Sequence, residues 1–126
     1  MEPKILVIDD DPETVDLITL ILERHGYKVV VGYHGLQGLA LAPMEIPDLI
    51  VADIKMPHID GIEMIRRMRR REPTCQTPIL ALTGFQREHS IEAIAAGADG
   101  VLTKPFTDDV LLASVKTLLA NAPHSP

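Results

Sequence analysis

The feature that most constrains the fold of this chain is a regular alternation of short aliphatic runs with longer segments of helical spacing. The aliphatic runs, rich in Val and Ile, lie at residues 4–8, 28–31, 49–52, 79–82 and 101–102. They lack alternating polar residues and therefore indicate strands that are covered on both faces. The helical segments lie at residues 13–25, 35–42, 61–71, 86–96 and 108–120. Five such units in succession predict an α/β fold with one parallel sheet and helices on both of its faces.

The spacing of apolar residues also predicts which side of each helix is buried. The first helical segment is followed by Gly26, a residue type that commonly ends helices. In residues 86–96 we expect Ile91, Ile94 and Ala95 to face the core.

Composition limits the classes of function. The net charge of −6, from 18 acidic and 12 basic residues, argues against nucleic acid as the main partner, because phosphate binding needs a basic surface. No apolar run is long enough to span a membrane. The single Cys75 cannot form an internal disulfide, and no other Cys or His lies near it at metal-binding spacing. We therefore expect a cytoplasmic domain, in a reducing compartment, that binds neither nucleic acid nor membrane.

Basic residues are concentrated in one stretch of the chain. Residues 66–72, RRMRRRE, hold five of the 12 Lys and Arg residues. Because Ile62, Ile65 and Met68 are expected to face inward, the arginines should project outward. The simplest interpretation is a solvated helix face, and the alternative is a docking surface for an acidic partner.

Polar side chains follow four of the five predicted strands. Asp9 and Asp10 follow the first strand, Asp53 the third, Thr83 the fourth and Lys104 the fifth. Ligands of open parallel sheets bind beyond the carboxyl ends of the strands. We therefore expect three carboxylates, a hydroxyl and an ammonium group to converge on one pocket.

This set of groups has a consistent chemistry. Two carboxylates about 4 Å apart repel each other by roughly 4 kcal/mol at an effective dielectric constant near 20, so the cluster needs a cation. Clustered carboxylates suit a hard ion such as Mg²⁺. A carboxylate can also be the nucleophile that takes a phosphoryl group, while a metal and a lysine offset the charge of that group. Helix capping is an alternative use for one acid, and we assign it to Asp11, ahead of Pro12.

The motifs at these strand ends resemble those of the receiver domains of two-component response regulators, including stand-alone chemotaxis receivers. The motifs are Asp9-Asp10, Asp53 followed by Met56-Pro57 and Asp60-Gly61, Thr83-Gly84, and Lys104-Pro105-Phe106. The resemblance spans residues 4–120 and implies the flavodoxin-like strand order 2-1-3-4-5, which places the first and third strands side by side. It also implies a receiver domain at residues 1–120, with residues 121–126 as a tail or the start of a linker.

The resemblance implies a metal site with named ligands. Asp10 and Asp53 match the direct carboxylate ligands of Mg²⁺, and Asp9 matches an acid that usually acts through water. The backbone carbonyl of Lys55 matches the remaining protein ligand.

The resemblance also implies which groups react. Asp53 matches the phospho-acceptor, Lys104 the lysine that contacts the phosphoryl group, and Thr83 the hydroxyl that moves toward it. We therefore expect Asp53 and Lys104 to be the catalytic pair. The peptide bond between Lys104 and Pro105 is expected to be cis.

The function that the resemblance implies is a phosphorylation-controlled signalling switch rather than a turnover enzyme. A histidine kinase or a phosphotransfer protein would present phosphohistidine, and the domain would catalyse only its own phosphorylation and dephosphorylation. The phosphorylated domain would then shift between two conformations. The output would come from a fused or separate module, and a homodimer is compatible with the family.

Three positions qualify the match to the family. Val101 stands where receivers often have the aromatic residue that turns inward on activation. Lys55 and Phe85 occupy two positions that commonly tune the lifetime of the phosphoryl group. Because a large side chain at either position could hinder the attacking water, we expect slow dephosphorylation.

Three other functions use similar residues or a similar fold. Phosphatases with an aspartyl nucleophile usually carry a second acid two residues later, where this chain has Lys55. Receiver-like modules that only bind partners typically lack one of the acids or the lysine, all of which this chain retains. Flavin-binding proteins of this fold have a Ser/Thr/Gly-rich phosphate loop after the first strand, where this chain has its acids.

Overall fold

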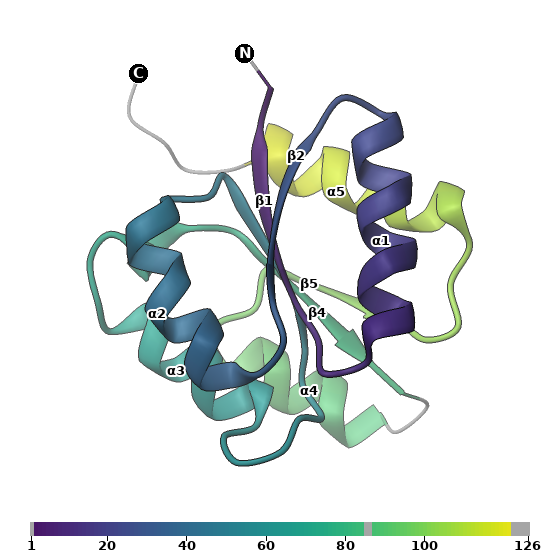
Figure 1. The fold of residues 1–126 in the computed structure, drawn as a ribbon. Coiled ribbons are helices and arrows are strands. Elements are labelled where there is room, and N and C mark those ends of the chain that lie inside the picture. Colours follow the sequence, from purple (N-terminus) through teal and green to yellow (C-terminus); the bar gives the residue numbers. More distant parts are fainter. Residues whose placement is uncertain (1, 85–86, 122–126) are drawn as a thin grey trace.

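The computed structural model describes residues 2–84 and 87–121, in which strands and helices alternate (Figure 1). The strands are β1 (Lys4–Ile8), β2 (Lys28–Gly32), β3 (Leu49–Asp53), β4 (Ile79–Thr83) and β5 (Gly100–Thr103). The helices are α1 (Pro12–Arg24), α2 (Gly35–Glu45), α3 (Gly61–Arg69), α4 (Arg87–Ala96) and α5 (Asp108–Ala120), and a short 3₁₀ helix, η1 (Thr74–Gln76), precedes β4. In the described part of the chain, no helix has the length and apolarity needed to cross a membrane.

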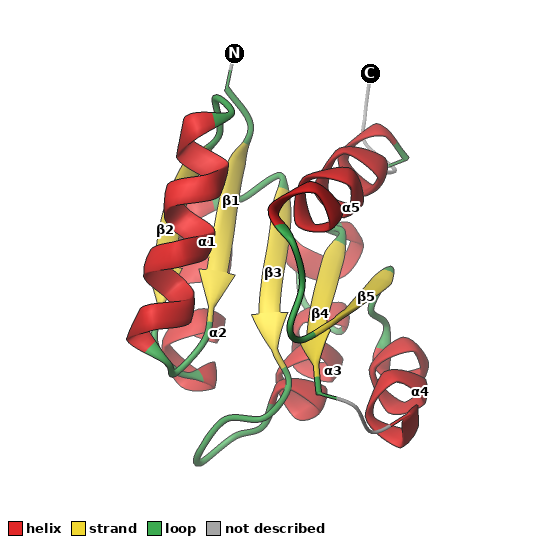
Figure 2. Ribbon diagram, turned by 90° about the vertical axis from the view of Figure 1, so that its right-hand side faces the viewer, coloured by secondary structure: helices red, strands yellow, loops and turns green. Residues whose placement is uncertain are grey.

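The sheet has the strand order β2-β1-β3-β4-β5, and all neighbouring strands are parallel. Helices α1 and α5 cover one face, and α2, α3 and α4 cover the other (Figure 2). Strand β1 pairs with both β2 and β3, and Ile8 lies opposite Ala52. The predicted fold class and strand order are confirmed, and the carboxyl ends of β1 and β3 lie side by side.

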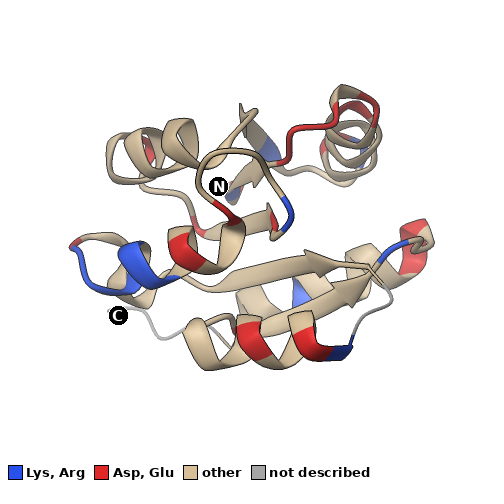
Figure 3. Cartoon of the chain, turned by 90° about the horizontal axis from the view of Figure 1, so that it is seen from below, with Lys and Arg blue, Asp and Glu red and all other residues tan. Residues whose placement is uncertain are grey.

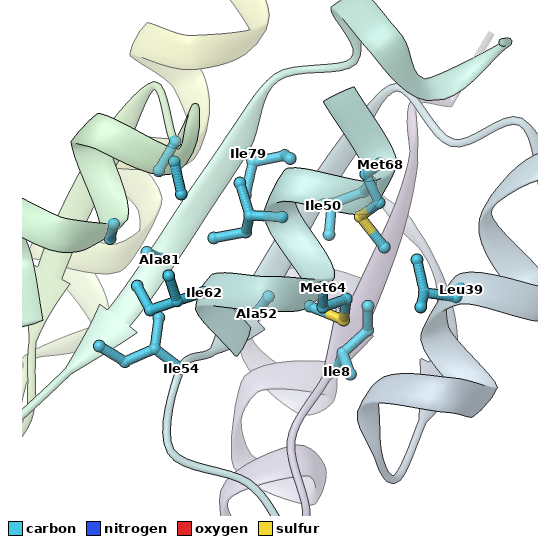
Figure 4. Close-up of a cluster of buried hydrophobic side chains, with 14 of the residues drawn as sticks. Ile8, Leu39, Ile50, Ala52, Ile54, Ile62, Met64, Met68, Ile79 and Ala81 are labelled. Carbon is cyan, nitrogen blue, oxygen red and sulfur yellow. The ribbon is translucent and has the colours of Figure 1, made fainter. Parts of the chain in front are cut away.

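Each face of the sheet has its own hydrophobic core, because successive strand residues point to opposite faces. On the side of α2, α3 and α4, strand residues such as Ile8 and Ile50 pack with Met64 and Met68 of α3 (Figure 4). On the other side, Val51 and its neighbours pack against α1 and α5. This two-sided burial explains why the strand sequences lack polar alternation.

Helices α1, α3 and α5 each begin after a residue whose side chain caps the first turn. Asp11 accepts hydrogen bonds from the backbone N–H of Glu13 and from the hydroxyl of Thr14, so its predicted capping role is confirmed. Asp60 and Thr107 cap α3 and α5 in the same way.

The predicted buried side of α4 is wrong. Ile91 and Ile94 are 62% and 51% exposed, whereas Ala93 and Ala96 are 0% and 9% exposed. The segment has apolar residues on both sides, so their spacing alone does not select the buried one. The small alanines pack into the core beside α3 and allow the two helices to approach closely.

Element boundaries also differ from the predicted ones. Helix α2 continues through Pro43 and ends at Glu45. The next residue, Ile46, caps the helix with a left-handed backbone, at a φ of 47°. Proline lacks the backbone N–H that would donate to the carbonyl four residues earlier, so the sequence favoured a helix end before Pro43. Helix α3 ends at Arg69, earlier than predicted. The predicted helix start at Gln86 lies outside the described residues.

Candidate functional site

Three carboxylates gather at the carboxyl edge of the sheet. Asp9 and Asp10 follow β1 and Asp53 ends β3, and one oxygen of each lies within 4.8 Å of the others. Asp9 is 0% and Asp53 is 7% exposed, whereas Asp10 is exposed. Buried carboxylates are costly unless hydrogen bonds or cations compensate their charge. The geometry therefore requires positive charge at this edge.

Lys104, which follows β5, supplies a cation to the cluster. Its Nζ lies 3.0 Å from Asp9 Oδ2 and 3.7 Å from Asp53 Oδ1. The backbone N–H of Asp11 donates to Asp9 Oδ1 at 3.0 Å, and that of Lys55 donates to Asp53 Oδ1 at 3.4 Å. Both oxygens of Asp9 are thus engaged by the protein itself, which fixes the orientation of this carboxylate.

The acidity of Asp53 is strongly altered by its surroundings. Burial, and after it the negative charge of Asp9, raises the pKa of Asp53 from 3.8 to about 6, although Lys104 acts in the opposite direction. Burial disfavours the charged form of Lys104, but its hydrogen bond to Asp9 and the charge of Asp53 outweigh this, and the pKa of Lys104 is raised. Lys104 is therefore protonated at neutral pH.

The charge balance of the cluster fits a divalent cation. Three carboxylates face one ammonium group, so negative charge remains in excess at neutral pH. The donors are hard oxygens at spacings that one ion can share, which suits Mg²⁺ better than softer metals. The raised pKa of Asp53 comes first from its burial and second from the negative charge of Asp9, and a bound cation would offset both effects.

Thr83 reaches the same edge, but its hydroxyl points to a different neighbour. It is 1% exposed, and its Oγ1 lies 3.4 Å from Ser90 Oγ of α4. Its backbone carbonyl accepts a hydrogen bond from the N–H of Lys104 at 2.7 Å. Ser90 was not expected from the sequence, because nothing in the spacing of α4 indicates contact with the end of β4.

Of the remaining predicted features, the structure confirms the cis peptide bond, describes the position of Val101 and does not describe Phe85. The Lys104–Pro105 peptide bond is cis, and so is Glu72–Pro73, which the sequence did not indicate. Val101 is half-buried on β5. Phe85 lies outside the described residues.

Gly61 is a site residue that strand-end reasoning missed. Its N–H donates to the carbonyl of Ile54 at 2.8 Å. A Cβ at this position would overlap the carbonyl oxygen of Asp53 and Cα of Ile54. The glycine therefore lets α3 begin directly against the end of β3 and holds the loop that leaves Asp53. In the sequence, only the Asp60-Gly61 pair indicates a role for this glycine, and the same pair is equally typical of an ordinary helix start.

Comparison with known proteins gives a consistent result. The family model described as the response regulator receiver domain matches residues 5–116. The DNA-binding dual master transcriptional regulator RpaA of Synechocystis is 42% identical over 125 residues, which cover 98% of this chain and 52% of the relative. Protein PilH of Pseudomonas aeruginosa is 33% identical, with 93% and 98% of the two chains covered.

Solved structures agree with the sequence matches. The receiver domain of a sensor histidine kinase from Pseudomonas aeruginosa, with a magnesium ion coordinated in its active site cleft, has a TM-score of 0.89 and 28% identity. The match covers 96% of this chain and 100% of that one. The chain spans about half the length of several relatives, including RpaA, and nearly all of PilH. The sequence, the strand order and the clustered acids together place this chain in the family of response regulator receiver domains.

Proposed function

We propose that the chain is a phosphorylation-controlled signalling switch in which Asp53 accepts a phosphoryl group in a Mg²⁺-dependent reaction. Residues 1–120 form the receiver domain, and residues 121–126 are a tail or the start of a linker. The observation that carries the proposal is the meeting of Asp9, Asp10 and Asp53 with Lys104 at one edge of the sheet, within a chain of this family.

Asp10 and Asp53 would hold Mg²⁺ directly, together with the backbone carbonyl of Lys55, and Asp9 would act through water. This division agrees with the hydrogen bonds of Asp9, whose two oxygens already accept from Asp11 and Lys104. The related receiver of the Pseudomonas sensor kinase has a magnesium ion in its cleft. When bound, Mg²⁺ supplies positive charge that offsets both the carboxylates and the incoming phosphoryl group.

In the reaction, a carboxylate oxygen of Asp53 attacks the phosphorus of a phosphohistidine. The new O–P bond forms as the N–P bond breaks, and the electron pair of that bond stays on the histidine nitrogen. Lys104, now 3.7 Å from Asp53 Oδ1, would contact a phosphoryl oxygen. Thr83 would turn its hydroxyl from Ser90 toward the same group. Hydrolysis of the aspartyl phosphate returns the domain to its initial state, and these two reactions are its only chemistry.

The proposed donor is a cytoplasmic histidine kinase or phosphotransfer protein. The output module is either fused to this domain or separate. Both arrangements agree with the relatives, since RpaA is about twice as long as the matched region and PilH is nearly the same length. A homodimer is a further arrangement that the proposal allows.

The test is to incubate the purified chain with acetyl phosphate and to measure its intact mass. We expect a gain of one phosphoryl group with Mg²⁺, loss of this gain with a chelator, and no gain in Asp53→Asn. Labelling that persists in Asp53→Asn would place the acceptor elsewhere. Rapid turnover of a phosphate monoester would support a phosphatase instead.

A further inference from the structure

Helix α2 exposes an apolar stripe to solvent. It has no charged residue before its last position, and Leu36 and Met44 are 51% and 75% exposed. Ala40, exposed between them, continues the same line, because residues four apart lie on one side of a helix. Ile46, just beyond the helix, is 65% exposed.

A surface helix normally presents charged or polar residues on the side that faces solvent. Leu36, Ala40, Met44 and Ile46 are called the apolar stripe below.

The carboxyl end of α3 carries an arginine cluster, formed by Arg66, Arg67, Arg70 and Arg71, all exposed. Arg66 and Arg67 share Glu63, at 3.8 Å and 3.1 Å. Within residues 2–84 and 87–121, neither Arg70 nor Arg71 forms an ion pair. The four arginines of the cluster outnumber the two acids among them, Glu63 and Glu72, so this region is positive on a chain whose net charge is −6.

The apolar stripe and the arginine cluster adjoin each other. Pro43, which precedes Met44, lines a narrow crevice together with Met68, Arg71 and Glu72 from the end of α3 and the turn after it. Helices α2 and α3 lie side by side (Figure 1). Figure 3 shows α2 without basic residues, next to the blue carboxyl end of α3. The two features therefore form one surface, apolar along α2 and positive along its α3 side.

We propose that this α2–α3 surface docks an amphipathic helix of a partner protein, with an apolar row flanked by Asp and Glu. The apolar row would cover the apolar stripe, which extends about 12 Å from Leu36 to Met44, or roughly two helical turns. The acids would pair with the arginine cluster, whose planar guanidinium groups match carboxylates in geometry. The partner thus combines apolar contact, which supplies affinity, with charge pairs, which fix its orientation.

Mixed charge in the surface favours a protein partner over other polyanions. Glu63 and Glu72 lie among the arginines, and Glu45 ends α2. A continuous anionic surface, such as a lipid membrane or a nucleic acid backbone, would be repelled by these acids and by the net negative charge of the chain. A helix with individually placed side chains can match both signs.

The test uses a synthetic helical peptide with a Leu row flanked by Glu, and the same peptide with Lys in place of Glu. Binding is followed by amide chemical shifts and by calorimetry on the full chain without Mg²⁺. We expect the Glu peptide to shift amides of α2 and residues 61–72 selectively and to weaken as salt is raised. The Lys peptide should bind at least about 10-fold more weakly.

Variants separate the two parts of the surface. Met44→Ser, and Arg67→Glu combined with Arg71→Glu, should each weaken binding by about 10-fold or more. Leu20→Ser and Arg24→Glu, matched substitutions of exposed residues on α1, should leave it unchanged. Asp53→Asn should also bind normally, so failure of the proposed phosphorylation would not affect this result.

Three results would overturn the proposal. One is equal binding of the Glu and Lys peptides, or shifts that centre on another face. Another is preferential binding to vesicles of anionic lipid or to duplex DNA. The third is self-association of the chain through α2, which would assign the surface to a second copy of the same protein.

Discussion

Replacing Asp53 with Asn should stabilise the protein when Mg²⁺ is absent and the pH is above 7. The pKa of Asp53 is about 6 in the folded chain, against an ordinary value of 3.8. A difference of about two units corresponds to about 3 kcal/mol of unfavourable free energy for the charged carboxylate in the folded state. Asn has nearly the same shape and can still accept the hydrogen bond of Lys55, but it carries no charge. For a domain of this size the gain corresponds to a rise in Tm of about 10 °C.

The pH dependence of this effect follows from proton linkage. Between about pH 4 and pH 6, folded Asp53 holds a proton that the unfolded chain has already released. The folded state therefore binds more protons, and the contribution of Asp53 to stability falls as the pH rises through this window. The Asn variant has no such group. The stability difference between the two proteins should be small near pH 4 and complete above pH 7.

Chemical denaturation with a chelator present, at several pH values, measures this difference. Asp16→Asn, a change of an exposed acid on α1, is the control and should alter the free energy of unfolding by less than about 0.5 kcal/mol. If Asp53→Asn is no more stable than the parent at about pH 8, or if its advantage persists unchanged in acid, then burial and repulsion do not perturb Asp53 as described.

Three further perturbations test the site and its supports. Millimolar Mg²⁺ should raise the Tm of the parent chain, because the ion binds only the folded cluster of acids, and Asp10→Asn should reduce this rise. An unchanged Tm in calorimetry would argue against the metal site. Gly61→Ala should destabilise the chain by about 2–3 kcal/mol in urea, because the added Cβ overlaps backbone atoms. Gly84→Ala should cost less than about 1 kcal/mol, because among the described residues no atom lies within 4 Å of a Cβ added there. Arg69→Met should lower the free energy of unfolding by about 2–4 kcal/mol, because Arg69 donates to three backbone carbonyls and pairs with Asp99 at 2.7 Å. Arg66→Met, a change of an exposed arginine, should alter this free energy little.

The position of the site was predictable because it depends on topology more than on side-chain packing. Parallel strands present their carboxyl ends at one edge, so any polar residues after those strands must lie near each other. The meeting of Asp10 with Asp53 needs the adjacency of β1 and β3, which the resemblance implied and the strand pairing confirms. The capping role of Asp11 was predictable for a local reason, since a cap interacts only with the next few residues.

Other features depend on contacts between distant segments and were not predictable. The buried side of α4 is selected by close packing against α3, which favours Ala93 over the larger Ile94. Gly61 matters because it touches the end of β3, and a sequence pattern does not contain that distance. Arg69 belongs to a run of arginines that looks uniformly solvent-exposed, yet its side chain is only 19% exposed and joins α3 to Asp99.

A crystal structure of the chain with Mg²⁺ and beryllofluoride tests the central claim most directly. The account predicts one metal ion in contact with the carboxylates of Asp10 and Asp53, and the beryllofluoride group joined to Asp53 beside the Lys104 ammonium. A metal ion bound away from these acids, or beryllofluoride attached to another residue, would contradict it.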